Sequence, residues 1–163
     1  MDIKLVIFDK DGTLVGVPDP AANRPANRPE EQVLLPSRRE KIRALRKQGV
    51  QIALASNQGG VAWGFISAQD ALRLMADVAR KVGGVAAWRF CPHDARAAGK
   101  PNAREEYAIP CGCRKPAPGM LIDLMDALGV TPEETVFVGD RDEDRLAAQA
   151  AGVRFMWADE FFR

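Results

Sequence analysis

The stretch FDKDGTLVG, residues 8–16, continues directly from the apolar run IKLVIF, residues 3–8. That run is short, rich in β-branched and aromatic residues and ends in a glycine-containing turn, a pattern typical of a fully buried strand. Asp9 and Asp11 then lie where the strand ends. Ligands of open parallel sheets bind outside the carboxyl ends of the strands. The two carboxylates therefore indicate either a chemical site or, since D-G is a common turn sequence, a hydrogen-bonded turn.

Length and composition fit one domain over residues 1–163 with a substantial core, because 47% of the 163 residues are hydrophobic and 28% are charged. The net charge of +1 gives no broad surface for nucleic acid, so a small-molecule partner is favoured. No apolar run has membrane-spanning length, and the amino-terminus lacks signal-peptide features. We expect a cytoplasmic monomer without a membrane or nucleic-acid partner.

Strand-like and helix-like segments alternate along the chain, which predicts a mainly parallel sheet with helices on both faces. The fold class is α/β: a doubly wound, Rossmann-like, three-layer α/β/α sandwich. After residues 3–8, the expected strands are 50–57, 85–91, 134–140 and 153–158, and the expected helices are 38–49, 67–84, 120–129 and 143–152.

Polar residues recur at the carboxyl ends of these strands, so they are expected to converge in space. Lys115 precedes the third helix, with Pro116 and Pro118 fixing the chain around it. Each residue taken alone also suits a helix cap or turn, and Asp142 and Asp144 in particular suit a helix start. The residues concerned are Asp9 and Asp11, then Ser56, Asn57 and Gln58, and finally Asp140, Asp142 and Asp144.

The order of these motifs, DGT after the first strand, Ser56, Lys115 and GDRDED, resembles the haloacid-dehalogenase-type phosphatases over nearly the whole chain. The resemblance implies that Asp9 is the nucleophile that forms an aspartyl-phosphate and that Asp11 is the general acid and base. It also implies that Ser56 and Lys115 hold the phosphoryl group. Mg²⁺ would be bound by Asp9, the carbonyl of Asp11, and Asp140.

These implied roles agree with the chemistry of phosphoryl transfer, which depends on positioning and on electrostatic stabilisation of equatorial oxygens. An anionic nucleophile and an anionic phosphate repel, so a divalent cation is needed beside Asp9, and two carboxylates with one carbonyl suit Mg²⁺. Asp11, two residues on, can reach the leaving-group oxygen. Asp144 is interpreted as orienting Lys115 or Asp140 rather than as binding the metal.

All three cysteines and the sole histidine fall in one segment, residues 91–113. An odd number of cysteines does not form a disulfide framework. Cys91, His93, Cys111 and Cys113 instead offer the full tetrahedral set of a structural Zn²⁺ site with no open position. Such a site would staple the loop and direct Arg114 and Lys115, which follow it.

The zinc motif narrows the resemblance to the nearly capless subfamily IIIA, which includes the heptose bisphosphate phosphatases and the related histidinol-phosphate phosphatases. The matching stretches are SNQGG (56–60), CPH (91–93), CGCRKPAPGML (111–121) and VGDRDEDRLAA (138–148). This implies a minimal cap and hydrolysis of a small phosphorylated metabolite, with a heptose bisphosphate favoured. The candidate substrate contacts are Asn57, Gln58, Trp63 and Arg114.

Two features depart from that subfamily. Trp63 stands where its members commonly have arginine, which removes a cation near the site. Residues 16–36 are rich in proline and contain ANRP twice in tandem. Proline at this density favours extended, poorly packed chain. The loop either shapes substrate choice through Arg24 and Arg28 or is a solvated insertion, and the solvated insertion is favoured.

Other functions stay open at this point. A nucleic-acid 3′-phosphatase shares the DxDGT core but is disfavoured by the near-neutral charge and the zinc loop. A non-catalytic phospho-acceptor or binding module also uses Asp, Ser or Thr, Lys and Mg²⁺ on a doubly wound sheet. Asp11 discriminates against that module, because rapid turnover of an aspartyl-phosphate needs a general base beside it.

Overall fold

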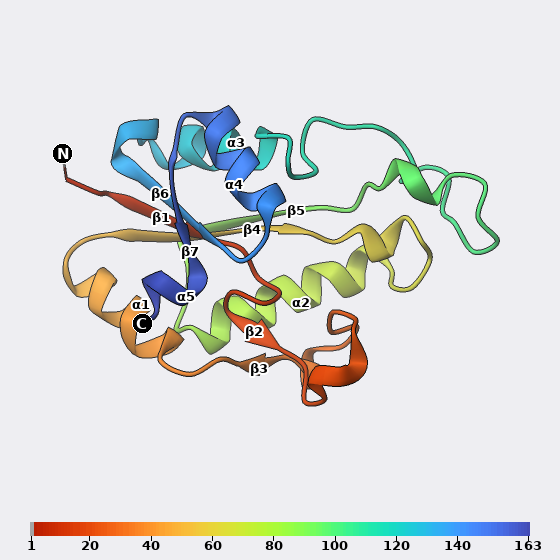
Figure 1. Cartoon of the computed structure of the whole chain (residues 1–163), viewed down its shortest axis with the longest axis horizontal. Coiled ribbons are helices and arrows are strands. Elements are labelled where there is room, and N and C mark those ends of the chain that lie inside the picture. Colours follow the sequence, from red (N-terminus) through yellow and green to blue (C-terminus); the bar gives the residue numbers. More distant parts are fainter. Residues whose placement is uncertain (1) are drawn as a thin grey trace.

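A five-stranded, wholly parallel sheet forms the centre of the computed structural model, which describes residues 2–163 (Figure 1). The strand order is β5-β4-β1-β6-β7. β1 therefore lies centrally, and its four residues are all buried. The strands are β1 (Leu5–Phe8), β4 (Gln51–Asn57), β5 (Ala87–Cys91), β6 (Thr135–Gly139) and β7 (Arg154–Trp157).

Helices cover both faces of this sheet, as predicted for a doubly wound α/β fold (Figure 1). α1 (Arg38–Lys47), α2 (Ala68–Lys81) and α5 (Ala158–Phe161) lie on one face. α3 (Gly119–Leu128) and α4 (Asp142–Ala151) lie on the other. Most element ends differ from expectation by one to three residues, and Ala158, predicted to end the last strand, is instead the first residue of α5. No helix among residues 2–163 is both long and apolar enough to cross a membrane.

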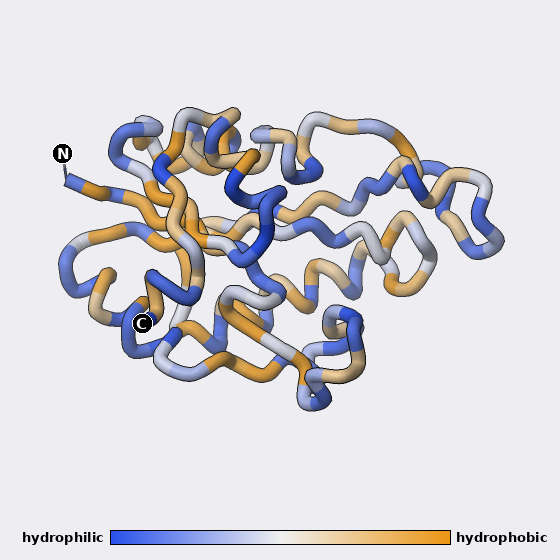
Figure 2. The backbone as a smooth tube through the Cα atoms, in the orientation of Figure 1, coloured by the Kyte–Doolittle hydropathy of each residue, from blue (hydrophilic) through white to orange (hydrophobic). Residues whose placement is uncertain are grey.

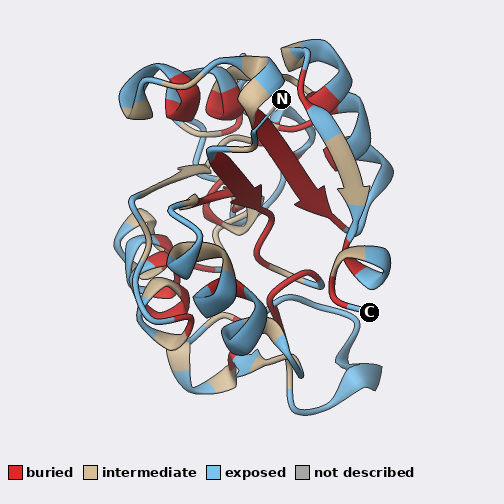
Figure 3. Ribbon diagram, turned by 90° about the vertical axis from the view of Figure 1, so that its left-hand side faces the viewer, coloured by how far each residue is buried: buried red, intermediate tan, exposed pale blue. Residues whose placement is uncertain are grey.

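Alternate residues of β1 enter two separate hydrophobic cores, because successive side chains of a strand point to opposite faces. Val6 and Phe8 pack with Ile42 of α1 and Met75 of α2, and Leu5 and Ile7 pack with α3 and α4. The part of the run that forms β1, Leu5–Phe8, is hydrophobic throughout (Figure 2). The central strands are buried between the helical layers (Figure 3). This double burial explains why the run lacks the alternation of a half-exposed strand.

The second half of the proline-rich loop 16–36 is packed against α2, whereas residues 18–25 are exposed, so the favoured interpretation of a solvated insertion fits only the first half of the loop. The ends of the loop pair as a short antiparallel ribbon, β2 (Val15–Gly16) with β3 (Val33–Leu34). Between them lie two 3₁₀ turns, η1 (Pro20–Ala22) and η2 (Pro29–Glu31). Gln32 is buried and donates to the carbonyl of Leu74 at 3.1 Å and to Asp77 at 2.9 Å. Buried side-chain hydrogen bonds thus anchor a segment whose proline content suggested no packing.

Candidate active site

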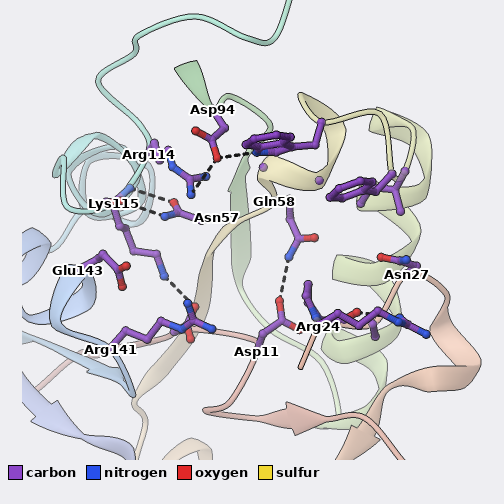
Figure 4. A pocket seen from close by; sticks show the side chains of 18 of the residues that line it. Asp11, Arg24, Asn27, Asn57, Gln58, Asp94, Arg114, Lys115, Arg141 and Glu143 are labelled. Carbon is purple, nitrogen blue, oxygen red and sulfur yellow. Dashed lines mark hydrogen bonds and ion pairs between the residues drawn. The ribbon is translucent and has the colours of Figure 1, made fainter. Parts of the chain in front are cut away.

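A cavity of about 640 Å³ opens at the carboxyl edge of the sheet and is bordered by both long loops. Asp9 and Asp11 follow β1 and line the cavity. Asn57 and Gln58 stand at the end of β4, and Figure 4 shows both with Asp11 around the cavity. Residues 23–27 of the proline-rich loop also line the cavity. The convergence expected of strand-end residues therefore occurs, because parallel strands place all their carboxyl ends on one edge.

Asp9 and Lys115 make direct contact at the floor of the cavity. The Lys115 Nζ donates to Asp9 Oδ1 at 2.7 Å, to Asp144 Oδ1 at 2.7 Å and to the carbonyl of Ala55 at 3.0 Å. The Lys115 side chain is only 3% exposed. Burial acts to lower the pKa of Lys115, but the charges of Asp9 and Asp144 raise it above the usual value. Lys115 is therefore a fixed cation beside the predicted nucleophile.

Three carboxylates gather around this lysine. Each of Asp9, Asp140 and Asp144 offers an oxygen, and these atoms lie within 4.8 Å of one another. Partial burial, followed by the charge of Asp9, raises the pKa of Asp140 to about 7. Three carboxylates and one ammonium leave a net charge of −2, which a divalent cation would neutralise. Oxygen ligands of this kind suit Mg²⁺, so the residues present fit the predicted metal.

Two glycines allow these carboxylates to approach the backbone. A Cβ on Gly12, whose φ is +82°, would lie 2.1 Å from Asp140 Oδ2. A Cβ on Gly139 would lie 2.5 Å from Asp144 Cβ and Oδ2. Both distances are far below van der Waals contact, so any other residue at either position would displace a carboxylate. The glycines of DGT and VGD thus have a steric role in the cluster.

Asp144 touches both groups that it was predicted to orient. Its Oδ1 accepts from Lys115, and its Oδ2 accepts from the backbone N–H of Asp140 at 3.2 Å and of Arg141 at 3.1 Å. These contacts are those expected of an orienting residue. Asp142 differs: its side chain is 65% exposed and pairs with Arg145 at 2.7 Å, so it belongs to the surface of α4.

The carboxylate of Asp11 is held apart from Asp9 by two other side chains. Its Oδ1 accepts from Lys10 Nζ at 2.7 Å and its Oδ2 accepts from Gln58 Nε2 at 3.2 Å. Lys10 is fully buried and also donates to Gln32 at 2.7 Å. The sequence analysis missed Lys10 and Gln32. A charged residue between the two motif aspartates was a signal for Lys10, whereas nothing local marked Gln32.

The three polar residues at the end of β4 have different roles. Ser56 is buried, and its hydroxyl accepts from Gln58 Nε2 at 2.8 Å. Asn57 makes two hydrogen bonds to the backbone of Lys115: it accepts from the amide N–H at 2.9 Å and donates to the carbonyl at 3.0 Å. Asn57 therefore positions Lys115. Gln58 joins Ser56 to Asp11 and also lines the cavity.

The four predicted zinc ligands form one cluster, with all four donor atoms within 4.8 Å of one another. Cys91 Sγ and Cys113 Sγ each lie 3.5 Å from Cys111 Sγ, and His93 Nδ1 lies 3.5 Å from Cys91 Sγ and 3.4 Å from Cys113 Sγ. Thiolates on one tetrahedral zinc ion would be separated by about 3.8 Å. The cluster therefore has nearly the dimensions of a tetrahedral site, apart from the Cys91–Cys113 pair at 2.6 Å.

The protonation of this cluster is set by its surroundings. Burial, together with a hydrogen bond to Cys113, raises the pKa of the Cys91 thiol. Burial also acts to raise the pKa of Cys111, but the backbone N–H groups of Arg114 and Cys113 lower it. The amide of Arg114 lies 3.3 Å from Cys111 Sγ. The cluster is thus coupled to the backbone just before Lys115.

Arg114 and Trp63, both predicted substrate contacts, line the cavity and share a partner that the sequence analysis missed. Trp63 Nε1 donates to Asp94 Oδ2 at 3.0 Å, and Arg114 Nη2 lies 3.5 Å from the same oxygen. Arg24 also lines the cavity and pairs with Glu31 at 2.9 Å. Arg28 is 75% exposed and is not among the lining residues, so only the first arginine of the repeat faces the cavity.

The fold and site are those of a HAD-like hydrolase. A HAD-hydrolase-like family model matches residues 112–159. The crystal structure of D,D-heptose 1,7-bisphosphate phosphatase from B. bronchiseptica, complexed with magnesium and phosphate, superimposes with a TM-score of 0.74 and 29% identity. The match covers 94% of this chain and 79% of that one.

Curated relatives define the family more narrowly. The D-glycero-beta-D-manno-heptose-1,7-bisphosphate 7-phosphatase of Pseudomonas putida is 34% identical over 156 residues, which cover 93% of this chain and 80% of the relative. The enzyme of the same name from Pasteurella multocida is 33% identical over 122 residues. The chain belongs to the family that contains these phosphatases. The matched region covers 71% of this chain and 61% of the Pasteurella protein.

Proposed function

We propose that this protein is a Mg²⁺-dependent phosphomonoester hydrolase that acts on a small phosphorylated sugar. The observation that carries the proposal is the contact between Asp9 and Lys115 within a three-carboxylate cluster at the floor of a cavity. A heptose bisphosphate is the leading substrate, because it is the substrate in the names of the relatives from Pasteurella and Pseudomonas. The cavity, at about 640 Å³, has the size expected for a ligand of this kind.

Asp9 is proposed as the nucleophile, since one of its oxygens contacts Lys115 and the other accepts only a long hydrogen bond from Thr13. Both oxygens of Asp144, in contrast, are held by Lys115 and by backbone N–H groups.

An oxygen of Asp9 would attack phosphorus and form an aspartyl-phosphate, while the leaving-group oxygen takes a proton from Asp11. Asp11 would then accept a proton from the water that hydrolyses the acyl phosphate. Lys10 and Gln58 hold Asp11 away from Asp9, which keeps the two carboxylates in separate roles.

Lys115 would stabilise the negative charge on the equatorial oxygens of the transferring group. Asp144 and the Asn57 amide fix this lysine from two sides. A bound Mg²⁺ would supply charge neutralisation between nucleophile and phosphate, held by Asp9, Asp140 and the carbonyl of Asp11. Ser56 is proposed to donate its hydroxyl hydrogen to the phosphoryl group, because the Gln58 bond uses only the oxygen of that hydroxyl, as an acceptor.

Zn²⁺ is proposed to be structural, bound by Cys91, His93, Cys111 and Cys113. All four donors come from the protein, which leaves no position for a catalytic water. The Arg114 amide contact to Cys111 Sγ connects the cluster to the segment that carries Lys115. Zinc would therefore act on catalysis through the position of Lys115.

The test is phosphate release from three substrates, each with and without Mg²⁺: heptose bisphosphate, histidinol phosphate and a 3′-phosphorylated oligonucleotide. We expect Mg²⁺-dependent turnover of the heptose ester and none in the Asp9→Asn variant. Turnover that survives in Asp9→Asn would refute the assigned nucleophile. Preferred hydrolysis of the oligonucleotide would refute the sugar substrate. Silence on all three from zinc-loaded protein would refute the heptose substrate, and would mean either that Trp63 and the ANRP loop have moved specificity elsewhere or that the chain is the non-catalytic binding module.

A further inference from the structure

An aromatic pair on the cavity wall has a face without a protein partner. The rings of Trp63 and Phe65 are stacked, with centroids 6.3 Å apart and an interplanar angle of 12°. Both residues line the cavity, yet Phe65 is 68% exposed. A large apolar ring that borders a ligand cavity and stays exposed is a candidate ligand contact.

The orientation of this pair is fixed in advance by a buried carboxylate. Trp63 Nε1 donates to Asp94, whose side chain is 3% exposed. Asp94 in turn accepts from Arg96 Nε at 2.9 Å and Nη2 at 2.8 Å, and Arg114 lies at 3.5 Å. The Arg96 hydrogen bond is the largest cause that keeps the pKa of Asp94 below its usual range. Such preorganisation reduces the entropy that a ligand must lose on binding.

The turn that carries the pair is also tightly specified. Gly64, between the two aromatic residues, has a φ of +78°, and a Cβ there would lie 2.0 Å from the carbonyl oxygen of Asn102. Any other residue would move the turn away from the 91–113 loop. The wall formed by Trp63 and Phe65 therefore requires glycine between its two aromatic residues.

The same cavity also has polar amide side chains, in contrast to this apolar aromatic wall. Asn27 of the proline-rich loop and Gln58 after β4 line the cavity, and Figure 4 shows both with Arg24 around the space. Amides both donate and accept, so they suit hydroxyl groups. A flat apolar surface combined with such amides suits a ligand that has an apolar C–H face and hydroxyls at its edge. A pyranose ring has this form.

We propose that Phe65, backed by Trp63, stacks against the C–H face of a pyranose ring in the leaving group of the substrate. The proposal rests on the proposed function and adds to it the side chains that recognise the sugar ring. It also assigns a use to Trp63, the residue that departs from the arginine expected there. Where an arginine would offer a cation to an anionic group, Trp63 and Phe65 offer an apolar surface to the uncharged C–H face of the ring.

The matched pair glucose 6-phosphate and sorbitol 6-phosphate tests this directly. Both are esters of a primary C6 hydroxyl, and only the first has a ring. We expect wild-type protein to prefer glucose 6-phosphate in kcat/KM, and Phe65→Ala to lose that preference by about three- to tenfold, the size of an aromatic contact. Phe65→Tyr is expected to retain it. Ile122→Ala, at a position 43% exposed on α3, is the control.

A binding measurement separates this proposal from the proposed function. Calorimetric titration of the Asp9→Asn variant with each ester reports ring preference without turnover, and Asp9→Asn/Phe65→Ala reports its loss. Turnover without ring preference would overturn the stacking proposal and leave the phosphatase intact. Ring preference in binding, with no turnover by wild-type protein, would support the stacking proposal and overturn the phosphatase. Equal binding of the two esters, or a preference unchanged by Phe65→Ala, would also overturn the stacking proposal.

Discussion

Two clusters of metal-ligating side chains lie on either side of Arg114 and Lys115, and they are built in opposite ways. The sulfur cluster (Cys91, His93, Cys111, Cys113) takes its donors from two tripeptides at the ends of one loop. The carboxylate cluster (Asp9, Asp140, Asp144) takes its oxygens from the ends of β1 and β6 and from α4, with Lys115 among them. The first cluster has one donor on the sheet, Cys91 at the end of β5, and three donors in the loop, whereas the second is fixed by two strand ends and a helix.

This difference indicates which of the two metals has a structural role. Soft thiolates with a full set of four donors need the ion to hold the loop in place. The carboxylates already have an internal cation and backbone N–H donors, so their arrangement persists without a metal and leaves room for a substrate oxygen. Removal of zinc should therefore unfold a segment, and removal of Mg²⁺ should only stop the reaction.

The largest effect is expected from Cys111→Ser. Loss of one thiolate ligand should abolish stable zinc binding and lower the free energy of unfolding by several kcal/mol, because metal affinity in such a site is folding free energy. Thermal unfolding with zinc content measured in parallel checks this. A chelator should lower the stability of the wild-type protein towards that of the variant and leave the variant unchanged. Equal stability of the wild-type protein and the variant, both measured in the presence of zinc, would contradict the structural role.

Lys115→Met should destabilise the metal-free protein by about 3 kcal/mol at pH 8, because two buried carboxylates lose their common cation. Denaturant unfolding measures this change. The double variant Lys115→Met/Asp144→Asn should recover part of the loss, since one of the two unpaired charges is gone. An unchanged stability would show that the carboxylate cluster does not depend on its lysine.

Mg²⁺ affinity should fall as the pH drops through about 7, because the raised pKa of Asp140 means that a proton competes with the metal there. The sign follows from linkage: above this pKa the carboxylate is charged and free for the cation, and below it each pH unit weakens binding by up to tenfold. Calorimetric titration at pH 6 and pH 8 checks this. Asp140→Asn should remove the pH dependence together with most of the affinity. Zinc retention should stay unaffected by that substitution.

The smallest effect is expected from Thr13→Val. The buried Thr13 hydroxyl lies 3.3 Å from Asp9 Oδ2 and 3.4 Å from Asp140 Oδ1, so its one hydrogen is shared between two carboxylate acceptors at long distance. Its loss should cost the metal-free protein about 1 kcal/mol. Denaturant unfolding with and without Mg²⁺ measures this. Thr135→Val, which removes one hydroxyl bond to the carbonyl of Thr131 away from the cluster, is the control. A loss above about 3 kcal/mol would show that the cluster depends on this hydroxyl more than on its lysine.

The sequence by itself determined the layered fold, both ligand clusters and the cavity edge, because each depends on local patterns. The apolar run 3–8, the glycines of DGT and VGD, and the pairs of zinc ligands are all readable within a few residues. Once strands alternate with helices, parallel pairing brings every strand end to one edge. That rule converts separate motifs into one predicted site without knowledge of the strand order.

Only the tertiary structure decided how the loops pack. Gln32 bonds to Lys10, 22 residues away, and to Asp77, 45 residues away, and Trp63 bonds to Asp94 across 31 residues. No periodicity or motif encodes such contacts, because a buried amide or indole takes whichever partner the packed chain brings within reach. The same holds for Phe65, whose exposed ring is meaningful only because it borders the cavity. Local sequence patterns thus determined the positions of the reacting carboxylates and Lys115, and long-range packing determined which side chains line the cavity around them.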